Sequence, residues 1–257
     1  MKQRIFYDSY TDDVVENSNQ DYELPPDYQW IRKGVWNKVM YALGYALALT
    51  IAFVYLRFVR HVHYHGRYTL WKFRRNGYII YGNHTQPFGD PFIPLLACLG
   101  KRAFGIAGTA NLGIPFIGKL LPYMGALPLV NTKYGMKKLH EAVAQRIAEK
   151  HVVFMYPEAH VWPYYTQIRR FPASAMHYQQ QLECLSFTLT TTYRKRLIGK
   201  RPRIDVYVDG PFYPQHDETP RMQRLILQYE TILSMQNNAQ KSNYQYIEYV
   251  KRNEHTA

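Results

Sequence analysis

Cysteine is scarce in this chain of 257 residues, which contains only Cys98 and Cys184. Neither lies in a Cys-x-x-Cys pattern or beside a cluster of cysteine and histidine, so the sequence predicts neither a disulfide framework nor a zinc site. We expect both thiols to be buried as small apolar side chains in a reducing compartment. No internal repeat is visible in the sequence either.

Acidic residues are the second shortage, with 19 Asp and Glu against 32 Lys and Arg and a formal net charge of +13. Seven of the acids precede position 28, so residues 1–28 carry a formal charge of −5 and the rest of the chain carries +18. A strongly basic body attracts nucleic acid, anionic lipid headgroups, phosphorylated metabolites or acidic proteins. The sequence shows no nucleic-acid-binding module, so we expect no nucleic-acid partner.

Residues 1–28 show no sustained hydrophobic periodicity and end in Leu24-Pro25-Pro26-Asp27. Acidic composition followed by a stiff proline pair is typical of a solvated tail. The sequence therefore predicts that residues 1–28 are a flexible acidic tail that is dispensable for chemistry.

A run of 18 residues without charge, 39–56, follows this tail. As a helix it would be roughly 27 Å long, which is just enough to cross the apolar core of a bilayer. Basic and aromatic residues flank both ends, so the positive-inside rule does not fix an orientation. We predict that residues 29–62 form a membrane-anchoring helical segment that either spans the bilayer or lies in one leaflet. The alternative is a long buried helix of a soluble fold.

Short apolar strands alternate with amphipathic helices in residues 63–257, which predicts an α/β domain with a mixed sheet flanked by helices. Functional sites of such domains lie in loops at strand ends. Thr132 and Thr219 have the side chains and positions of helix N-caps. The predicted strands are Tyr68–Phe73, Tyr78–Tyr81, Phe104–Ala107, Ala126–Val130, Val152–Tyr156, Leu185–Thr191 and Ile204–Val208, and the predicted helices cover 91–99, 132–150 and 220–237.

The first candidate site follows the strand at Tyr78–Tyr81, where Asn83 and His84 precede Asp90 by a short turn. A carboxylate that accepts the Nδ1–H of a histidine leaves Nε2 free as a general base. Because no serine accompanies the pair, we expect the attacking hydroxyl to belong to the substrate. Asp90 before Pro91 also fits a helix N-cap followed by the first helical residue, and the two roles are compatible.

Three further segments follow this site in a fixed order: Gly113 to Asn131, Val152 to His160 and Asp205 to Phe212. Together with the Asn-His and Asp of the first site, they resemble the glycerolipid acyltransferase superfamily over roughly residues 65–215. The resemblance implies that His84 is the general base, that Asp90 orients it, and that Glu158 contacts the acceptor. It also implies that the N-terminal apolar segment is a helical membrane anchor.

The sequence departs from the family pattern in three places. Five residues instead of four separate His84 from Asp90, and we expect Gly89 to absorb the extra residue. Ala159-His160 replaces Gly-Thr after Glu158, and Asn131 stands where the family often has the arginine expected to grip the acceptor phosphate. The substrate-binding candidates are therefore Asn83, Glu158, Lys119, Lys133 and Arg169, with either lysine able to supply the missing charge.

The resemblance implies an acyltransferase on the cytoplasmic side of a membrane. It would move a fatty acyl group from acyl-CoA or acyl carrier protein to a lysophospholipid hydroxyl, with 1-acyl-glycerol 3-phosphate as the expected acceptor. A thioester is already activated, so we expect no metal or redox cofactor. The alternatives are another lipid acceptor, a hydrolase that uses His84 and Asp90 on water, or a non-catalytic protein that binds anionic lipid. The sequence gives no indication of oligomeric state.

Overall fold

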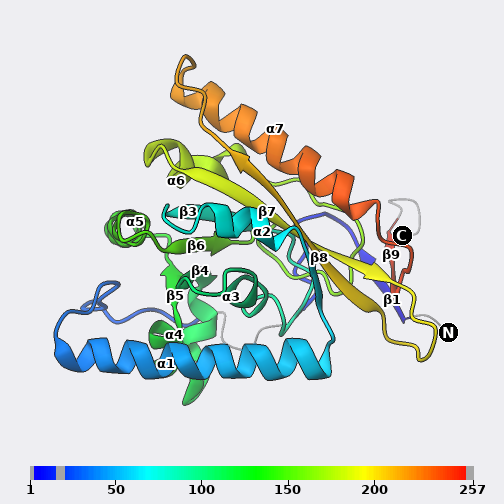
Figure 1. Ribbon diagram of the computed structural model, residues 1–257, viewed down its shortest axis with the longest axis horizontal. Helices are drawn as coiled ribbons and strands as arrows, with labels where there is room; N and C mark the ends of the chain where they lie inside the picture. Colours follow the sequence, from blue (N-terminus) through cyan, green and yellow to red (C-terminus); the bar gives the residue numbers. More distant parts are fainter. Residues whose placement is uncertain (1–2, 16–20, 253–257) are drawn as a thin grey trace.

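A seven-stranded mixed sheet forms the centre of the computed structural model, which describes residues 3–15 and 21–252 (Figure 1). The strand order is β2-β8-β7-β3-β6-β4-β5. Strands β7, β3, β6, β4 and β5 are parallel, β8 is antiparallel to β7, and β2 is parallel to β8. The strands are β2 (His63–His65), β3 (Tyr78–Gly82), β4 (Ala103–Gly108), β5 (Ala126–Leu129), β6 (Val152–Met155), β7 (Leu185–Arg194) and β8 (Arg203–Phe212).

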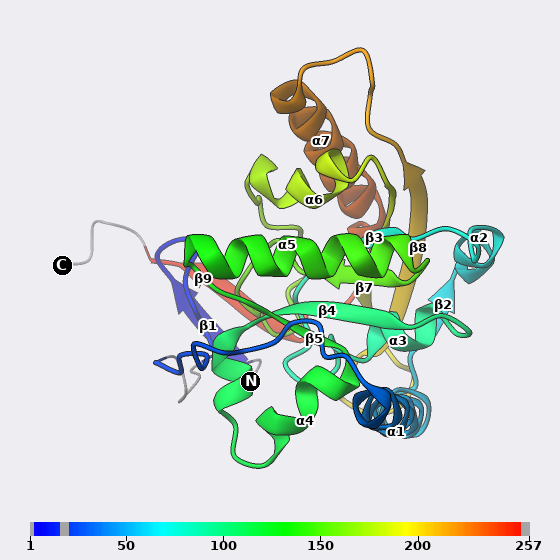
Figure 2. The same ribbon diagram turned by 90° about the vertical axis from the view of Figure 1, so that its left-hand side faces the viewer.

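Helices cover both faces of this sheet, as the sequence predicts (Figure 2). In β3, Tyr78 and Ile80 point to the apolar core beneath α1, α2 and α3, whereas Ile79 and Tyr81 point to the core beneath α5, α6 and α7. Successive side chains of a strand face opposite sides, so a strand covered on both faces is apolar at every position. The helices are α1 (Val35–Val54), α2 (Arg67–Lys72), α3 (Ile93–Ala97), α4 (Ile117–Met124), α5 (Lys133–Ala148), α6 (His177–Gln181) and α7 (Pro220–Ala239), with single helical turns at Tyr55–Val59, Thr109–Gly113 and Ala173–Met176.

Thr132 and Thr219 cap α5 and α7, because their hydroxyls accept the backbone N–H groups of Gly135 and Met222. The strand predicted at Tyr68–Phe73 is wrong, since this segment is α2. The apolar residues of this segment fit the period of a helix as well as that of a strand. Leu70 is the one buried residue of α2, and a single helical turn is enough to bury it. Helix α4 was not predicted, and it contains Pro122.

Helix α1 lies along the domain, with one face packed against α3 and α4. Ala48, Ala52 and Leu56 are buried on this face. At Gly44, helix α1 approaches α4 so closely that a Cβ atom would lie 2.8 Å from the Cβ of Tyr123. Among the described residues, the helical run Val35–Val59 is the one long and apolar enough to cross a membrane, although core helices of soluble proteins meet the same criterion.

The opposite face of α1 is apolar but exposed. Its large side chains in contact with solvent are Val35, Trp36, Val39, Leu43, Leu47, Phe53 and Val54, and they are followed by Phe58 and Val59 in the helical turn. We call this set the outer face of α1. A helix that is apolar on both faces has a second apolar surface to cover, which the domain itself leaves open.

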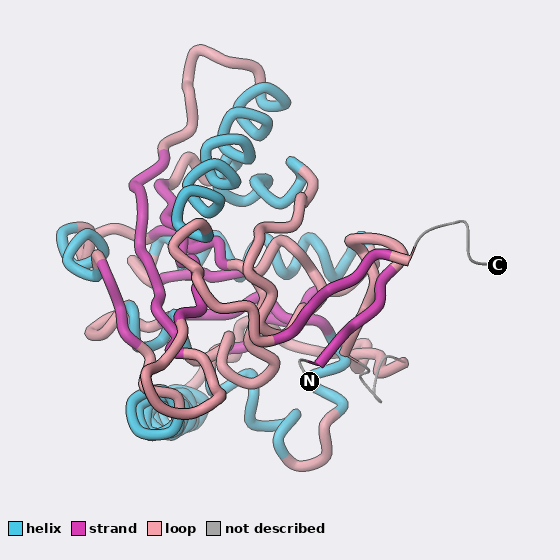
Figure 3. The backbone as a smooth tube through the Cα atoms, turned by 90° about the vertical axis from the view of Figure 1, so that its right-hand side faces the viewer, coloured by secondary structure: helices cyan, strands magenta, loops and turns pink. Residues whose placement is uncertain are grey.

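Part of the predicted flexible tail is instead a strand. β1 (Gln3–Tyr7) pairs in parallel with β9 (Ile247–Lys251) in a separate two-stranded sheet (Figure 3). The expectation of a flexible tail is therefore wrong for Gln3–Tyr7, while residues 1–2 and 16–20 lie outside the described part of the chain. Gln3–Tyr7 is only five residues long and mostly exposed, so its sequence lacks the apolar alternation that predicts a strand.

Candidate active site

The candidate residues gather at the edge of the sheet where its parallel strands end. Strand β3 leads directly into Asn83 and His84, and β6, its neighbour, leads into Tyr156 and Glu158. The buried side chain of Asn83 donates to the carbonyl of Thr191 at 2.9 Å and accepts the N–H of the same residue at 2.7 Å. Asn83 therefore ties the end of β3 to β7, and its amide is directed away from any substrate.

His84 and Asp90 form the pair that the sequence predicts. Nδ1 of His84 lies 2.6 Å from Oδ2 of Asp90, which also accepts the N–H groups of Thr85 at 2.8 Å and Gln86 at 2.9 Å. The Asp90 side chain is fully buried, whereas that of His84 is 20% exposed. A carboxylate at Nδ1 selects the tautomer with its proton on Nδ1, and no described residue hydrogen-bonds Nε2. The free lone pair of Nε2 is therefore available to a ligand.

The structure excludes the second role expected for Asp90, that of a helix N-cap. Asp90 does not cap α3, since the helix begins at Ile93 without a side-chain cap. Nor does Gly89 supply a left-handed residue; its missing Cβ atom would instead lie 3.2 Å from Cβ of Gln86. The five-residue spacing is absorbed by a tight turn in which two backbone N–H groups converge on the carboxylate.

Burial raises the pKa of Asp90, and the hydrogen bonds from His84 and the backbone of Gln86 and Thr85 oppose this rise. These donors stabilise the negatively charged form of the Asp90 carboxylate, which a protonated imidazole of His84 would face. Oδ1 of Asp90 is buried, and none of the described residues bonds to it.

Tyr156 is a site residue that the sequence analysis missed. Its ring stacks on the His84 ring, with centroids 4.7 Å apart and planes 17° apart, and its hydroxyl donates to the carbonyl of Asp90 at 2.6 Å. Gly82 makes room for it, because a Cβ atom there would lie 2.4 Å from the Tyr156 ring. Burial raises the pKa of Tyr156 well above its ordinary value, so its hydroxyl remains a donor. Its place directly before Pro157-Glu158, at the end of a buried strand, was the available signal.

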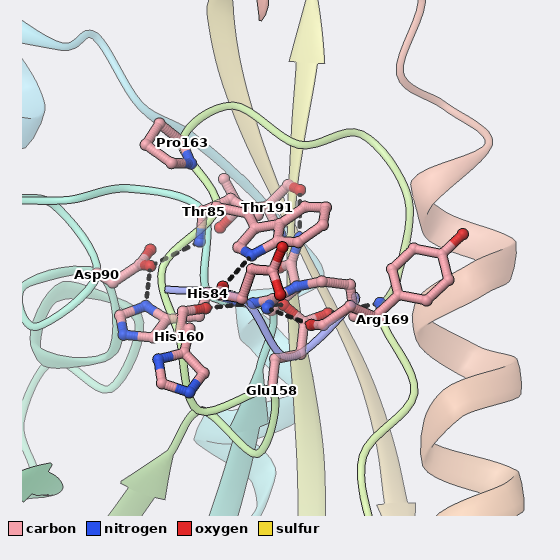
Figure 4. A network of polar contacts seen from close by, with 12 residues as sticks. His84, Thr85, Asp90, Glu158, His160, Pro163, Arg169 and Thr191 are labelled. Atoms are coloured by element: carbon pink, nitrogen blue, oxygen red, sulfur yellow. Dashed lines mark hydrogen bonds and ion pairs between the residues drawn. The ribbon is translucent and has the colours of Figure 1, made fainter. Parts of the chain in front are cut away.

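Glu158 and Arg169 form a buried ion pair behind His84, with side chains 0% and 1% exposed (Figure 4). Oε2 of Glu158 accepts the backbone N–H of His84 at 3.1 Å and the Arg169 guanidinium at 3.1 Å, while Oε1 accepts the N–H of Arg169 at 2.9 Å. The guanidinium also donates to the carbonyls of His160 and Tyr10 and lies over the Trp162 ring. In this geometry Glu158 holds the backbone of His84 and Arg169 holds Glu158, so neither side chain is open to a substrate.

The loop that follows Glu158 packs against β1 and β9, the two strands of the small sheet. Trp162 donates its backbone N–H to the carbonyl of His84 at 2.9 Å. Its indole is fully buried and contacts Tyr7 of β1 and Tyr249 of β9, with centroid distances of 4.8 and 4.9 Å. The indole N–H donates to the carbonyl of Asp12 at 2.9 Å. The N-terminal segment therefore supports the loop that holds His84.

Lys119 and Lys133 lie at the same edge of the sheet but are exposed, on α4 and at the start of α5. The structure does not bring either lysine into contact with His84.

His160 has Nδ1 3.5 Å from a carboxylate oxygen of Asp13. In the described part of the chain, no three His, Cys, Asp or Glu side chains gather closely enough to hold a metal ion, and His65 hydrogen-bonds Asp205 at 2.7 Å.

No protein-family model matches the chain, and no curated protein matches its sequence. A search of solved structures finds the crystal structure of the 1-acyl-sn-glycerophosphate (LPA) acyltransferase PlsC from Thermotoga maritima. The two share a TM-score of 0.51 at 14% sequence identity, over 81% of each chain. The chain has the fold of this acyltransferase. At such low identity the likeness concerns the fold alone, and function depends on the site.

Proposed function

We propose that this chain is a membrane-associated acyltransferase that transfers a fatty acyl group from a thioester to a lysophospholipid hydroxyl. One observation carries the proposal: His84, oriented by a buried Asp90, presents a free Nε2 at the ends of the parallel strands. The fold shared with a glycerolipid acyltransferase supports it. The order of the sequence motifs that resemble that superfamily supports it as well.

In the proposed reaction, Nε2 of His84 accepts the proton of the acceptor hydroxyl as its oxygen attacks the thioester carbonyl. The carbon–oxygen bond forms, the carbon–sulfur bond breaks, and the imidazolium returns its proton to the departing thiolate. Asp90 stabilises the imidazolium through Nδ1. Tyr156, Glu158 and Arg169 act as positioning residues: Tyr156 contacts the His84 ring and the Asp90 carbonyl, Glu158 accepts the backbone N–H of His84, and Arg169 holds Glu158 in place.

The proposed acceptor is 1-acyl-glycerol 3-phosphate, and acyl-CoA or acyl carrier protein is the proposed donor. A net charge of +13 suits all of these anionic molecules. Lys119 and Lys133 are the proposed sources of charge for the acceptor phosphate, as point charges in place of the missing arginine. Their side chains extend from α4 and α5, the two helices that follow the neighbouring strands β4 and β5.

The test is a product analysis by lipid mass spectrometry. Purified protein in detergent micelles is given an acyl thioester together with 1-acyl-glycerol 3-phosphate, a lysophosphatidylcholine, or no acceptor. We expect a diacyl product that depends on the acceptor, with 1-acyl-glycerol 3-phosphate preferred. Release of free fatty acid without diacyl product would identify a thioester hydrolase instead, and failure to consume the thioester would identify a non-catalytic lipid-binding protein.

We further propose that α1 lies in one leaflet, because its inner face is already packed on the domain along its length. Leu43 and Leu47, on the outer face, are 62% and 46% exposed. The variant Leu43→Glu/Leu47→Glu should reduce binding to phosphatidylcholine vesicles by about a hundredfold or more, since each buried leucine contributes about 1.5–3 kcal/mol. Sedimentation of vesicles in high salt measures this binding.

The matched control is Met222→Glu/Leu225→Glu on α7, where the two side chains are 44% and 40% exposed on the opposite side of the sheet. This variant should bind vesicles like the wild type. Equal binding by all three proteins would show that α1 serves only as a core helix.

A further inference from the structure

The turn between β7 and β8 carries a basic and apolar tip that the proposed reaction does not use. Residues 194–203 read Arg-Lys-Arg-Leu-Ile-Gly-Lys-Arg-Pro-Arg, with six basic residues and no acid. At the apex, Leu197 is fully exposed and Ile198 is 89% exposed. Two adjacent aliphatic side chains held out in water, between pairs of basic residues, indicate a surface that contacts something outside the chain.

This tip lies beside the C-terminal end of α1 and near the candidate active site. Strand β7 is parallel to β3, so it ends at the same edge of the sheet as His84. The guanidinium of Arg196 donates to the carbonyl of Arg60 at 3.2 Å, and the Arg60 side chain donates to Gln86, in the turn between His84 and Asp90, at 3.2 Å. The tip is therefore linked through Arg60 to the chain that leaves α1 and to the turn between His84 and Asp90.

The charge of the tip is not neutralised within the described part of the chain. Arg203 pairs with the buried carboxylate of Asp205, but Lys195, Arg196, Lys200 and Arg201 form no ion pair with any described residue. A surface hollow of 410 Å³ lies between the turn and the chain that leaves α1, lined by His61, His63, Lys195, Arg196, Leu197 and Arg203. An unneutralised basic hollow of this kind favours an external anion.

We propose that the β7–β8 turn is a second membrane-binding element, which inserts Leu197 and Ile198 at the bilayer interface and binds anionic lipid headgroups with its basic side chains. The inference rests on the proposed function in one respect, namely that α1 attaches the protein to the same membrane. Aliphatic side chains flanked by lysine and arginine are typical of interfacial binding to anionic lipid. An acidic carrier protein would also suit the charge, but the exposed Leu197 and Ile198, on a turn that contacts the chain leaving α1, favour the bilayer.

The electrostatic part is tested with the full chain and two kinds of vesicle, phosphatidylcholine alone and phosphatidylcholine with phosphatidylglycerol at a ratio of about four to one. Lys200→Gln/Arg201→Gln should bind the anionic vesicles about tenfold or more weakly than the wild type, because each basic residue at the surface contributes about fivefold. Binding to the neutral vesicles through α1 should not change. The control Lys137→Gln/Arg221→Gln removes the same charge from exposed positions on α5 and α7 and should retain the preference for anionic vesicles.

The insertion part is tested at Ile198. The native cysteines are buried, so a cysteine introduced by Ile198→Cys can be labelled selectively with an environment-sensitive dye. We expect its emission to shift to shorter wavelength on anionic vesicles, whereas the same dye at Asp217→Cys, in the exposed loop before α7, should not respond.

Three results would overturn the proposal. The first is an unchanged anionic preference in Lys200→Gln/Arg201→Gln, or an equal loss in the control. The second is a dye at position 198 that stays in water. The third is unchanged vesicle binding with a raised KM for acyl carrier protein, which would assign the turn to protein docking. Failure of the α1 attachment is distinguishable, because it removes the salt-resistant binding to neutral vesicles and leaves the salt-sensitive anionic preference.

Discussion

Replacing His84 by alanine should reduce the turnover number by about 10²–10⁴-fold, the usual loss when a general base is removed. The partly exposed His84 ring can be removed without opening the core, because its stacking partner Tyr156 stays anchored to the Asp90 carbonyl. The measurement is kcat for acyl transfer, together with a melting curve by circular dichroism. The control His216→Ala changes an exposed histidine outside the site and should retain full activity.

A His84→Ala variant that kept more than about a tenth of the wild-type rate would remove His84 from the mechanism. Asp90→Asn offers an independent test of the pair. The asparagine oxygen can take the position that accepts three hydrogen bonds, while its NH₂ group occupies the place of the unpartnered Oδ1. The fold should therefore survive, but the imidazolium loses its neighbouring charge and kcat should fall by about a hundredfold or more.

The largest effect on stability is expected at the buried ion pair behind His84. Arg169→Met leaves the Glu158 carboxylate with no cationic partner at a position with 0% exposure. Breaking a buried pair in this way costs about 3–5 kcal/mol, so the free energy of unfolding should fall by that amount. Urea denaturation followed by tryptophan fluorescence measures the change.

Arg170 supplies a matched control, since it is the next residue in the chain and is exposed. Arg170→Met should alter the free energy of unfolding by less than about 0.5 kcal/mol. The double variant Glu158→Gln/Arg169→Met removes the unpaired charge and should be more stable than Arg169→Met alone. If both Arg169→Met and the double variant matched the wild type, the ion pair would have no part in holding the loop.

Local features of the fold were predictable from residues that are close together in the chain. The helices that begin after Thr132 and Thr219 follow from a capping side chain and an apolar stripe that a single segment contains. The His84 and Asp90 pair was predictable for the same reason, because one turn separates the two side chains. At Tyr68–Phe73 the apolar residues fit a helix and a strand equally well, and the prediction of a strand was wrong. The segment forms a helix that buries Leu70.

The role of Glu158 shows where such reasoning stops. Its position after a strand places it at the site, but the sequence alone does not show that Arg169 and the backbone of His84 would occupy its oxygens. Those contacts depend on a loop that Trp162 and the strands at both ends of the chain hold in place. The same holds for Tyr156, whose stacking on His84 requires β3 and β6 to be neighbours.

The mixed α/β architecture, the apolar helix and the pairing of His84 with Asp90 were all predictable from the sequence alone. Each of these follows from hydrogen bonds, caps or periodicity within one short stretch of chain. The pairing of Gln3–Tyr7 with β9, the ion pair of Glu158 with Arg169, and the contact of the β7–β8 turn with Arg60 are visible only in the folded structure. These arrangements join segments far apart in the chain, so the packing that stabilises them forms only when the whole domain folds.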